Sequence, residues 1–252
     1  MTIEFLSLAE GSLAYQRQVG NKNSPGVFFL SGFASDMEGT KPSFLSQRCA
    51  AEVIPFIRFD YRGCGRSTGN FADGTIGGWL EDSLAVFDQL TEGPQIVVGS
   101  SMGGWLGLLL TQARPERIKA LIGIAAAPDF TEDLVWEKLT PTKREDVLRT
   151  GVFEQGKAAE DSRPPITLRL IEEARAHLVL RRPLPLTCPV RLLQGMQDQE
   201  VPWTHATRLA EHIAQDDVHI TFIKNGDHRL STPQDLELLW DTIGEFVPPS
   251  RA

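Results

Sequence analysis

The sequence has few cysteines, and their spacing forms neither a metal-binding nor a disulfide pattern. Its 252 residues include 3 cysteines, at Cys49, Cys64 and Cys188. Three is an odd number and no C-x-x-C pair occurs, so neither a disulfide framework nor a zinc site is indicated. We therefore expect no metal, and a reducing compartment, most simply the cytoplasm.

Basic charge is also scarce. Lys and Arg total 25 against 33 Asp and Glu, a formal net charge of -8. Binding to nucleic acid needs clustered Lys and Arg to neutralise phosphates, and the pair Arg181-Arg182 is too short to form such a cluster. We expect no nucleic-acid partner.

Long hydrophobic runs are missing as well. The apolar stretches are all shorter than the roughly 18 residues that a membrane span needs. Residues 1–6 include Glu4 and show neither a basic leader nor a long apolar core, so no signal or transit peptide is indicated. We expect a protein without a membrane span, a monomer by default, whose first strand lies at this end.

What the chain does contain is short apolar runs that alternate with longer helical patterns. This alternation predicts an α/β fold, a mostly parallel sheet with helices on both faces, preceded by an antiparallel hairpin. The eight expected strands are 3–8, 13–18, 26–30, 53–60, 95–99, 119–125, 190–194 and 218–224. The expected helices are 42–51, 75–90, 101–113, 202–213 and 233–246.

The alternation breaks between residues 129 and 185, where helical patterns occur with no convincing strand. We predict a helical cap at 129–185, inserted after the sixth strand into a core domain of residues 1–128 and 186–252. Helices are expected at 131–139, 141–150 and 166–180, with a polar loop at 151–165. Its apolar residues either roof a pocket or pack the cap onto the sheet: Leu134, Val135, Trp136, Ile166, Leu170 and Ile171.

One turn in the sequence suggests chemistry. Gly99-Ser100-Ser101-Met102-Gly103 lies between an apolar strand and a helix, which is the context of the nucleophile elbow G-x-S-x-G. Ser101 has glycines at both flanking positions, where a Cβ would collide with the neighbouring strand or helix. The alternative is a glycine-rich junction in some other α/β protein.

A nucleophilic serine needs a base, and the base needs an acid to orient it. His228 follows the last strand and is the predicted base, whereas His205, His212 and His219 lie within a helix or strand. Asp198, in the loop after the penultimate strand, is the predicted acid. The remaining acidic candidates are Asp129, the main competitor, then Glu200, and Asp227, which is adjacent to the base and so points away from it.

The oxyanion formed during acyl transfer needs two preorganised N–H donors. We expect one from the backbone of Met102, directly after the nucleophile, and one from Phe33, in the loop after the third strand. Gly32 allows that loop to turn. Both donors are backbone groups, so the side chains there would mainly shape the acyl pocket.

With these features in order, the chain resembles the α/β-hydrolases over essentially its whole length. Residues 60–67 are similar to the family's D-x-x-G-x-G-x-S turn, which braces the elbow. Segments 39–41, 57–61 and 93–106 resemble those α/β-hydrolases that remove palmitoyl groups from proteins and cleave acyl glucuronides. We expect no mitochondrial presequence, and the chain looks like a bacterial relative of these enzymes. Ser31 stands where many hydrolases have a histidine.

The resemblance implies a serine hydrolase with the triad Ser101, Asp198 and His228 and with no cofactor. It would cleave carboxylic esters or thioesters, of small molecules or of S-acylated proteins. Two alternatives remain open from the sequence. One is another reaction on the same triad, such as perhydrolysis or carbon–carbon bond hydrolysis, and the other is a catalytically silent binding module.

Overall fold

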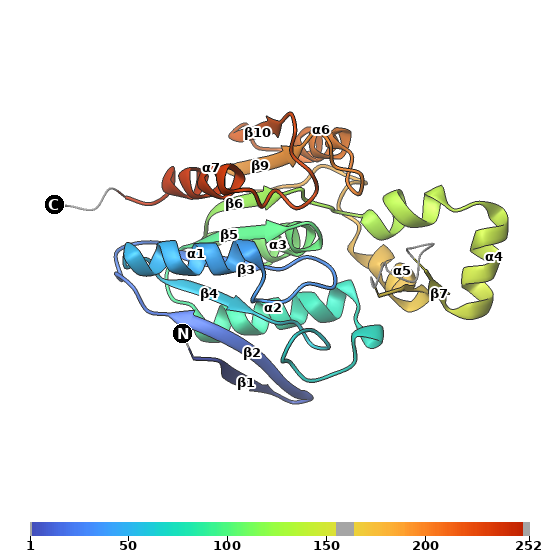
Figure 1. Ribbon diagram of the computed structural model, residues 1–252, viewed down its shortest axis with the longest axis horizontal. Coiled ribbons are helices and arrows are strands. Elements are labelled where there is room, and N and C mark those ends of the chain that lie inside the picture. The colour runs from blue at the N-terminus through green and yellow to red at the C-terminus, as the bar shows by residue number, and fades with distance from the viewer. Residues whose placement is uncertain (1, 155–163, 249–252) are drawn as a thin grey trace.

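An eight-stranded sheet runs through the computed structural model, which describes residues 2–154 and 164–248 (Figure 1). Its strands are β1 (Glu4–Leu8), β2 (Gly11–Gln18), β3 (Gly26–Leu30), β4 (Phe56–Phe59), β5 (Gln95–Ser100), β6 (Ile118–Ile124), β9 (Val190–Gly195) and β10 (Val218–Ile223). Their order across the sheet is β1-β2-β4-β3-β5-β6-β9-β10. The predicted hairpin is present, and β2 alone runs against the other strands because it pairs antiparallel with both β1 and β4.

Helices cover both faces of the sheet. On one face, α1 (Thr40–Ala51) and α7 (Pro233–Gly244) lie side by side (Figure 1). On the other face lie α2 (Ile76–Leu90), α3 (Met102–Ala113) and α6 (Trp203–His212). No helix within the described ranges is both long and apolar enough to cross a membrane.

The strand sequences explain these two layers. Side chains alternate between the faces of a strand, and in β3 Val27 and Phe29 belong to the cluster under α1 and α7, while Phe28 and Leu30 belong to the cluster under α2 and α3. All four are buried. A central parallel strand therefore reads as a continuous apolar run, because both of its faces are covered.

The segment between β6 and β9 leaves the sheet at its carboxyl edge (Figure 1). It holds a π-helical turn (Thr131–Val135), a 3-10 turn (Trp136–Lys138), α4 (Pro141–Thr150) and α5 (Leu168–Ala174). It also holds a small antiparallel pair, β7 (Val152–Phe153) and β8 (Ile166–Thr167), so the expectation of no strand here is wrong. Residues 155–163 of the predicted polar loop lie outside the described residues.

The helix expected over 166–180 is shorter than predicted. Ile166 and Thr167 pair with β7, and the Thr167 hydroxyl caps α5 by accepting the N–H of Leu170. After a 3-10 turn at 175–177 the chain becomes extended. There the N–H groups of Val179 and Leu180 donate to the carboxylate of Asp129, so they are not available to continue the helix.

The turn from β5 into α3 is packed without room for side chains at its glycines. A Cβ built on Gly99 would lie 2.2 Å from the carbonyl oxygen of Gly103 in α3, and one on Gly103 would lie 2.1 Å from the carbonyl oxygen of Leu30 in β3. Both contacts are with backbone atoms, and moving these would require a shift of the helix or the strand. This confirms the sequence-based prediction that a Cβ at either glycine would collide with the neighbouring strand or helix.

This packing gives a test of stability. We expect Gly103→Ala to lower the free energy of unfolding by about 1–3 kcal/mol, because the added methyl group overpacks the β3–α3 contact. Gly244→Ala is the matched control, since nothing lies within 4 Å of a Cβ built on Gly244 at the end of α7. Urea denaturation of both variants measures the difference, and equal stabilities would contradict this account.

Candidate active site

Ser101 occupies a strained backbone conformation at the carboxyl end of β5. Its φ is 54° and its ψ -119°, a region that residues with a side chain rarely adopt. Hydrogen bonds on both sides hold it there: its N–H donates to Ile124 O at 2.9 Å, and its carbonyl oxygen accepts the N–H groups of Gly104 and Ala127. The turn therefore presents the Ser101 hydroxyl at the sheet edge.

The structure brings the three residues of the predicted triad together. His228 Nε2 lies 3.1 Å from Ser101 Oγ, and His228 Nδ1 lies 2.8 Å from Asp198 Oδ2. Each residue follows a different strand, β5, β9 or β10, and the carboxyl ends of parallel strands meet at one edge of the sheet. The contacts form one continuous chain of hydrogen bonds from carboxylate to hydroxyl.

Asp198 is held as an anion. Its Oδ1 accepts the N–H groups of Glu200 at 2.8 Å and Val201 at 2.9 Å, and Gln194 Nε2 donates to its Oδ2 at 3.2 Å. Burial of the carboxyl group acts to raise its pKa, but the hydrogen bonds from His228 and from the backbone outweigh burial and lower the pKa of Asp198 below its ordinary value.

The other acidic candidates have different contacts. Asp129 is fully buried, but its carboxylate accepts the N–H groups of Val179 and Leu180 and pairs with Arg181 at 3.2 Å. It ties the segment after α5 to the residues that follow β6. Asp227 accepts two N–H groups of its own turn, those of Arg229 and Leu230.

The three histidines that the sequence places within a helix or strand are not in the cluster. His205 is buried and its Nε2 contacts Pro128 O at 2.7 Å, and burial lowers its pKa. His212 Nδ1 contacts the carbonyl oxygen of Arg208 in its own helix. His219 is largely exposed on β10.

The two residues expected to supply oxyanion donors flank Ser101. Met102 is the first residue of α3, so its N–H has no acceptor within the helix. Phe33 follows Gly32, and a Cβ built on Gly32 would lie only 3.4 Å from Ser101 Cβ. The loop after β3 therefore passes directly beside the serine.

Asp60 and Tyr61 brace that loop. Asp60 Oδ1 accepts the N–H of Met37 at 2.7 Å, and its Oδ2 accepts the N–H of Arg66 at 2.9 Å. The Tyr61 hydroxyl donates to the carbonyl oxygen of Ser31 at 3.1 Å. The D-x-x-G-x-G-x-S turn was expected to brace the elbow, but these bonds run to the loop after β3.

An aromatic cluster around Phe33 was not predicted. The ring of Phe33 lies 5.0 Å from that of Phe71 and 6.0 Å from those of Trp79 and Phe130, measured between centroids. The rings of Phe71, Trp79 and Phe130 thus pack around the residue that follows Gly32. Only the presence of aromatic residues is visible in the sequence, since Phe33, the Phe71 and Trp79 pair, and Phe130 come from three distant parts of the chain.

A cavity of about 620 Å³ opens beside Ser101 and His228, within the range of ligand-binding pockets. Part of its wall is apolar and comes from the segment between β6 and β9: Phe130, Leu134, Val135, Phe153 and Ile166. Of the residues expected either to roof a pocket or to pack, Leu134, Val135 and Ile166 line it. Leu170 and Ile171 are buried in the core.

Lys41 also lines this cavity, which the sequence did not suggest. Its ammonium donates to the carbonyl oxygen of Arg229 and to the Ser231 hydroxyl, in the segment directly after His228. Burial lowers the pKa of Lys41 to about 8. The lysine thus joins α1 to the loop that carries the histidine.

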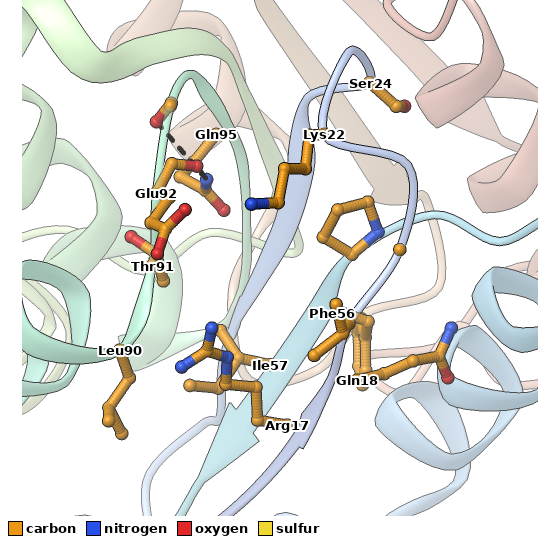
Figure 2. Close-up of a pocket in the computed structure, with 14 residues that line it drawn as sticks. Arg17, Gln18, Lys22, Ser24, Phe56, Ile57, Leu90, Thr91, Glu92 and Gln95 are labelled. Atoms are coloured by element: carbon orange, nitrogen blue, oxygen red, sulfur yellow. Dashed lines mark hydrogen bonds between the residues drawn. The ribbon is translucent and has the colours of Figure 1, made fainter.

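A second hollow lies at the opposite, amino-terminal ends of β3, β4 and β5 (Figure 2). Arg17, Lys22, Glu92 and Gln95 are among the residues that line it, and none of the predicted site residues does.

Within the part of the chain that the structure describes, no group of three or more His, Cys, Asp or Glu side chains is placed to hold a metal ion.

Comparison with known proteins agrees with this geometry. The sequence matches the alpha/beta hydrolase family over residues 27–238. It is 40% identical to the mitochondrial palmitoyl-protein thioesterase ABHD10 of Bos taurus over 248 residues, 98% of this chain and 80% of that protein.

Solved structures give the same result. Mouse alpha/beta hydrolase domain-containing protein 10 matches with a TM-score of 0.91 at 40% identity, covering 97% of this chain and 98% of that one. A protein from Agrobacterium vitis S4 matches with a TM-score of 0.92 at 37% identity, covering 98% and 100%. The predicted fold is confirmed, and the chain belongs to the alpha/beta hydrolase family.

Proposed function

We propose that the protein is a serine hydrolase that cleaves carboxylic esters or thioesters through an acyl-enzyme intermediate. The observation that carries this proposal is the chain of hydrogen bonds from Asp198 through His228 to Ser101, beside a cavity with a partly apolar wall. A serine hydroxyl is a weak nucleophile at neutral pH, and this arrangement supplies the base that activates it.

In the first half of the proposed reaction, Ser101 Oγ attacks the carbonyl carbon of the substrate while His228 Nε2 takes the hydroxyl proton. The buried Asp198 carboxylate stabilises the imidazolium and keeps Nδ1 protonated. The N–H groups of Phe33 and Met102 stabilise the oxyanion, each such donor being worth about 3–4 kcal/mol to the barrier. His228 then protonates the leaving alcohol or thiol, and Ser101 remains acylated.

In the second half, water replaces the leaving group in front of His228. Nε2 takes a proton from this water as it attacks the acyl carbon, and the second tetrahedral intermediate uses the same two N–H donors. Collapse of this intermediate releases the carboxylic acid and returns the proton to Ser101 Oγ. Every step is acid–base chemistry or carbonyl addition, and the residues named supply all the groups it needs.

The apolar part of the cavity wall suits the acyl group of the substrate. Phe33, Phe130, Leu134 and Ile166 present apolar surface next to the serine, and burial of an alkyl chain against such surface contributes about 0.8 kcal/mol per methylene. Relatives are named palmitoyl-protein thioesterases. We therefore propose acyl esters and thioesters with alkyl chains as the substrate class, with S-acylated proteins among them.

The first test is removal of the nucleophile. Ser101→Ala should lower kcat for p-nitrophenyl butyrate by a factor on the order of 10³ or more, while urea denaturation shows a folded protein, because the substitution removes only the hydroxyl oxygen. A fluorophosphonate probe should label the wild type at Ser101, as located by peptide mass spectrometry. Retained turnover in the variant, or the absence of an adduct in the wild type, would overturn the proposal.

The second test separates the two candidate acids. Asp198→Asn should lower kcat on the order of 10³- to 10⁴-fold, because an amide favours the wrong tautomer of His228. Asp129→Asn is the matched control: it also changes a buried carboxylate that accepts two N–H groups, and should reduce stability while leaving kcat within a few-fold. A larger loss of kcat in Asp129→Asn than in Asp198→Asn would refute the assignment.

A further inference from the structure

A second carboxylate faces the catalytic side of His228. Glu200 Oε2 lies 3.6 Å from His228 Nε2, the nitrogen that also contacts Ser101 Oγ at 3.1 Å. Asp198, by contrast, contacts the other ring nitrogen, Nδ1. The imidazole of His228 therefore lies between two acidic side chains, and only Asp198 has a place in the mechanism described above.

The two carboxylates differ in their surroundings. The side chain of Asp198 is 0% exposed, whereas that of Glu200 is 53% exposed and lines the cavity beside Ser101. The backbone of Glu200 is nevertheless held, because its N–H donates to Asp198 Oδ1 at 2.8 Å. The acid that orients His228 thus also helps to place Glu200 in the wall of the cavity.

That charge lies on the path of the leaving group. In the proposed mechanism, His228 Nε2 must reach the oxygen or sulfur atom that departs from the acyl carbon. Substituents on this atom must then lie in the space in front of Nε2, which Glu200 shares. In the proposed function the acyl chain packs against the apolar wall instead, so the charge of Glu200 would act on the leaving group.

Resting on the function proposed above, we propose that Glu200 determines specificity for the leaving group: it favours esters and thioesters whose alcohol or thiol part carries a positive charge and disfavours those with a negative charge. A positive charge on the leaving group would be attracted to the Glu200 carboxylate, and a negative charge would be repelled. Because Glu200 is exposed, both effects should weaken as the ionic strength rises. Two cations line the same cavity: Lys41, whose ammonium is bound to the Arg229 carbonyl and the Ser231 hydroxyl, and Arg229, which is exposed.

Three thioesters with one acyl group test the proposal. Butyrylthiocholine carries a cation, S-(3,3-dimethylbutyl) thiobutyrate is its neutral isostere, and the butyryl thioester of 2-mercaptoethanesulfonate carries an anion. In the wild type, kcat/KM should fall in that order. Glu200→Gln should reduce the cation-to-anion ratio of kcat/KM by about tenfold, since each charge contributes a few-fold. In the wild type, the same ratio should shrink when the salt concentration is raised.

Two further variants serve as controls. Glu200→Asp keeps the charge and should retain most of the ratio. Glu116→Gln removes an exposed carboxylate at the amino end of β6, opposite the catalytic edge, and should leave the ratio unchanged. An unchanged ratio in Glu200→Gln, or equal losses for all three thioesters, would overturn this proposal while hydrolysis itself continues. Failure of the wild type to cleave even the neutral thioester would instead contradict the proposed function, and this proposal with it.

Discussion

The site depends on the close packing of β5, α3 and β3 around one serine. Gly99 and Gly103 allow backbone to contact backbone, so α3 begins directly after Ser101 and lies against the end of β3. This contact forces Ser101 into a conformation with a positive φ, which costs free energy of the order of 1–3 kcal/mol. The surrounding parallel strands, buried on both faces, supply the rigidity that maintains it.

Three buried carboxylates hold the loops around that serine in the same way, each by accepting two backbone N–H groups. Asp60 holds the loop after β3, Asp129 the segment after α5, and Asp198 the loop after β9. Burial raises the pKa of Asp60 and of Asp129, whereas the bonds to Asp198, His228 among them, lower its pKa. The carboxylate most firmly held as an anion is therefore the one that faces an imidazole.

Local patterns explain which parts of this arrangement were predictable. The elbow follows from a short motif. The sheet follows from the alternation of apolar runs and helical patterns, and so does the placement of Ser101, Asp198 and His228 after three of its strands. The choice between Asp198 and Asp129 does not, because both follow strands at the same sheet edge and only their partners in space differ. The pair β7–β8, the aromatic rings around Phe33 and the contact of Lys41 with Arg229 are likewise made between distant segments.

The chemistry and the pocket wall have separate structural origins, and this separation has a consequence for how such a site changes. Ser101, Asp198 and His228 lie on loops fixed by the sheet, whereas Leu134, Val135 and Ile166 come from the segment between β6 and β9. Asp129 and Arg181 hold the two ends of that segment together through contacts that do not involve the triad. If the proposed function holds, substitutions in the wall should therefore alter the fit of the acyl chain and leave Ser101, Asp198 and His228 in place.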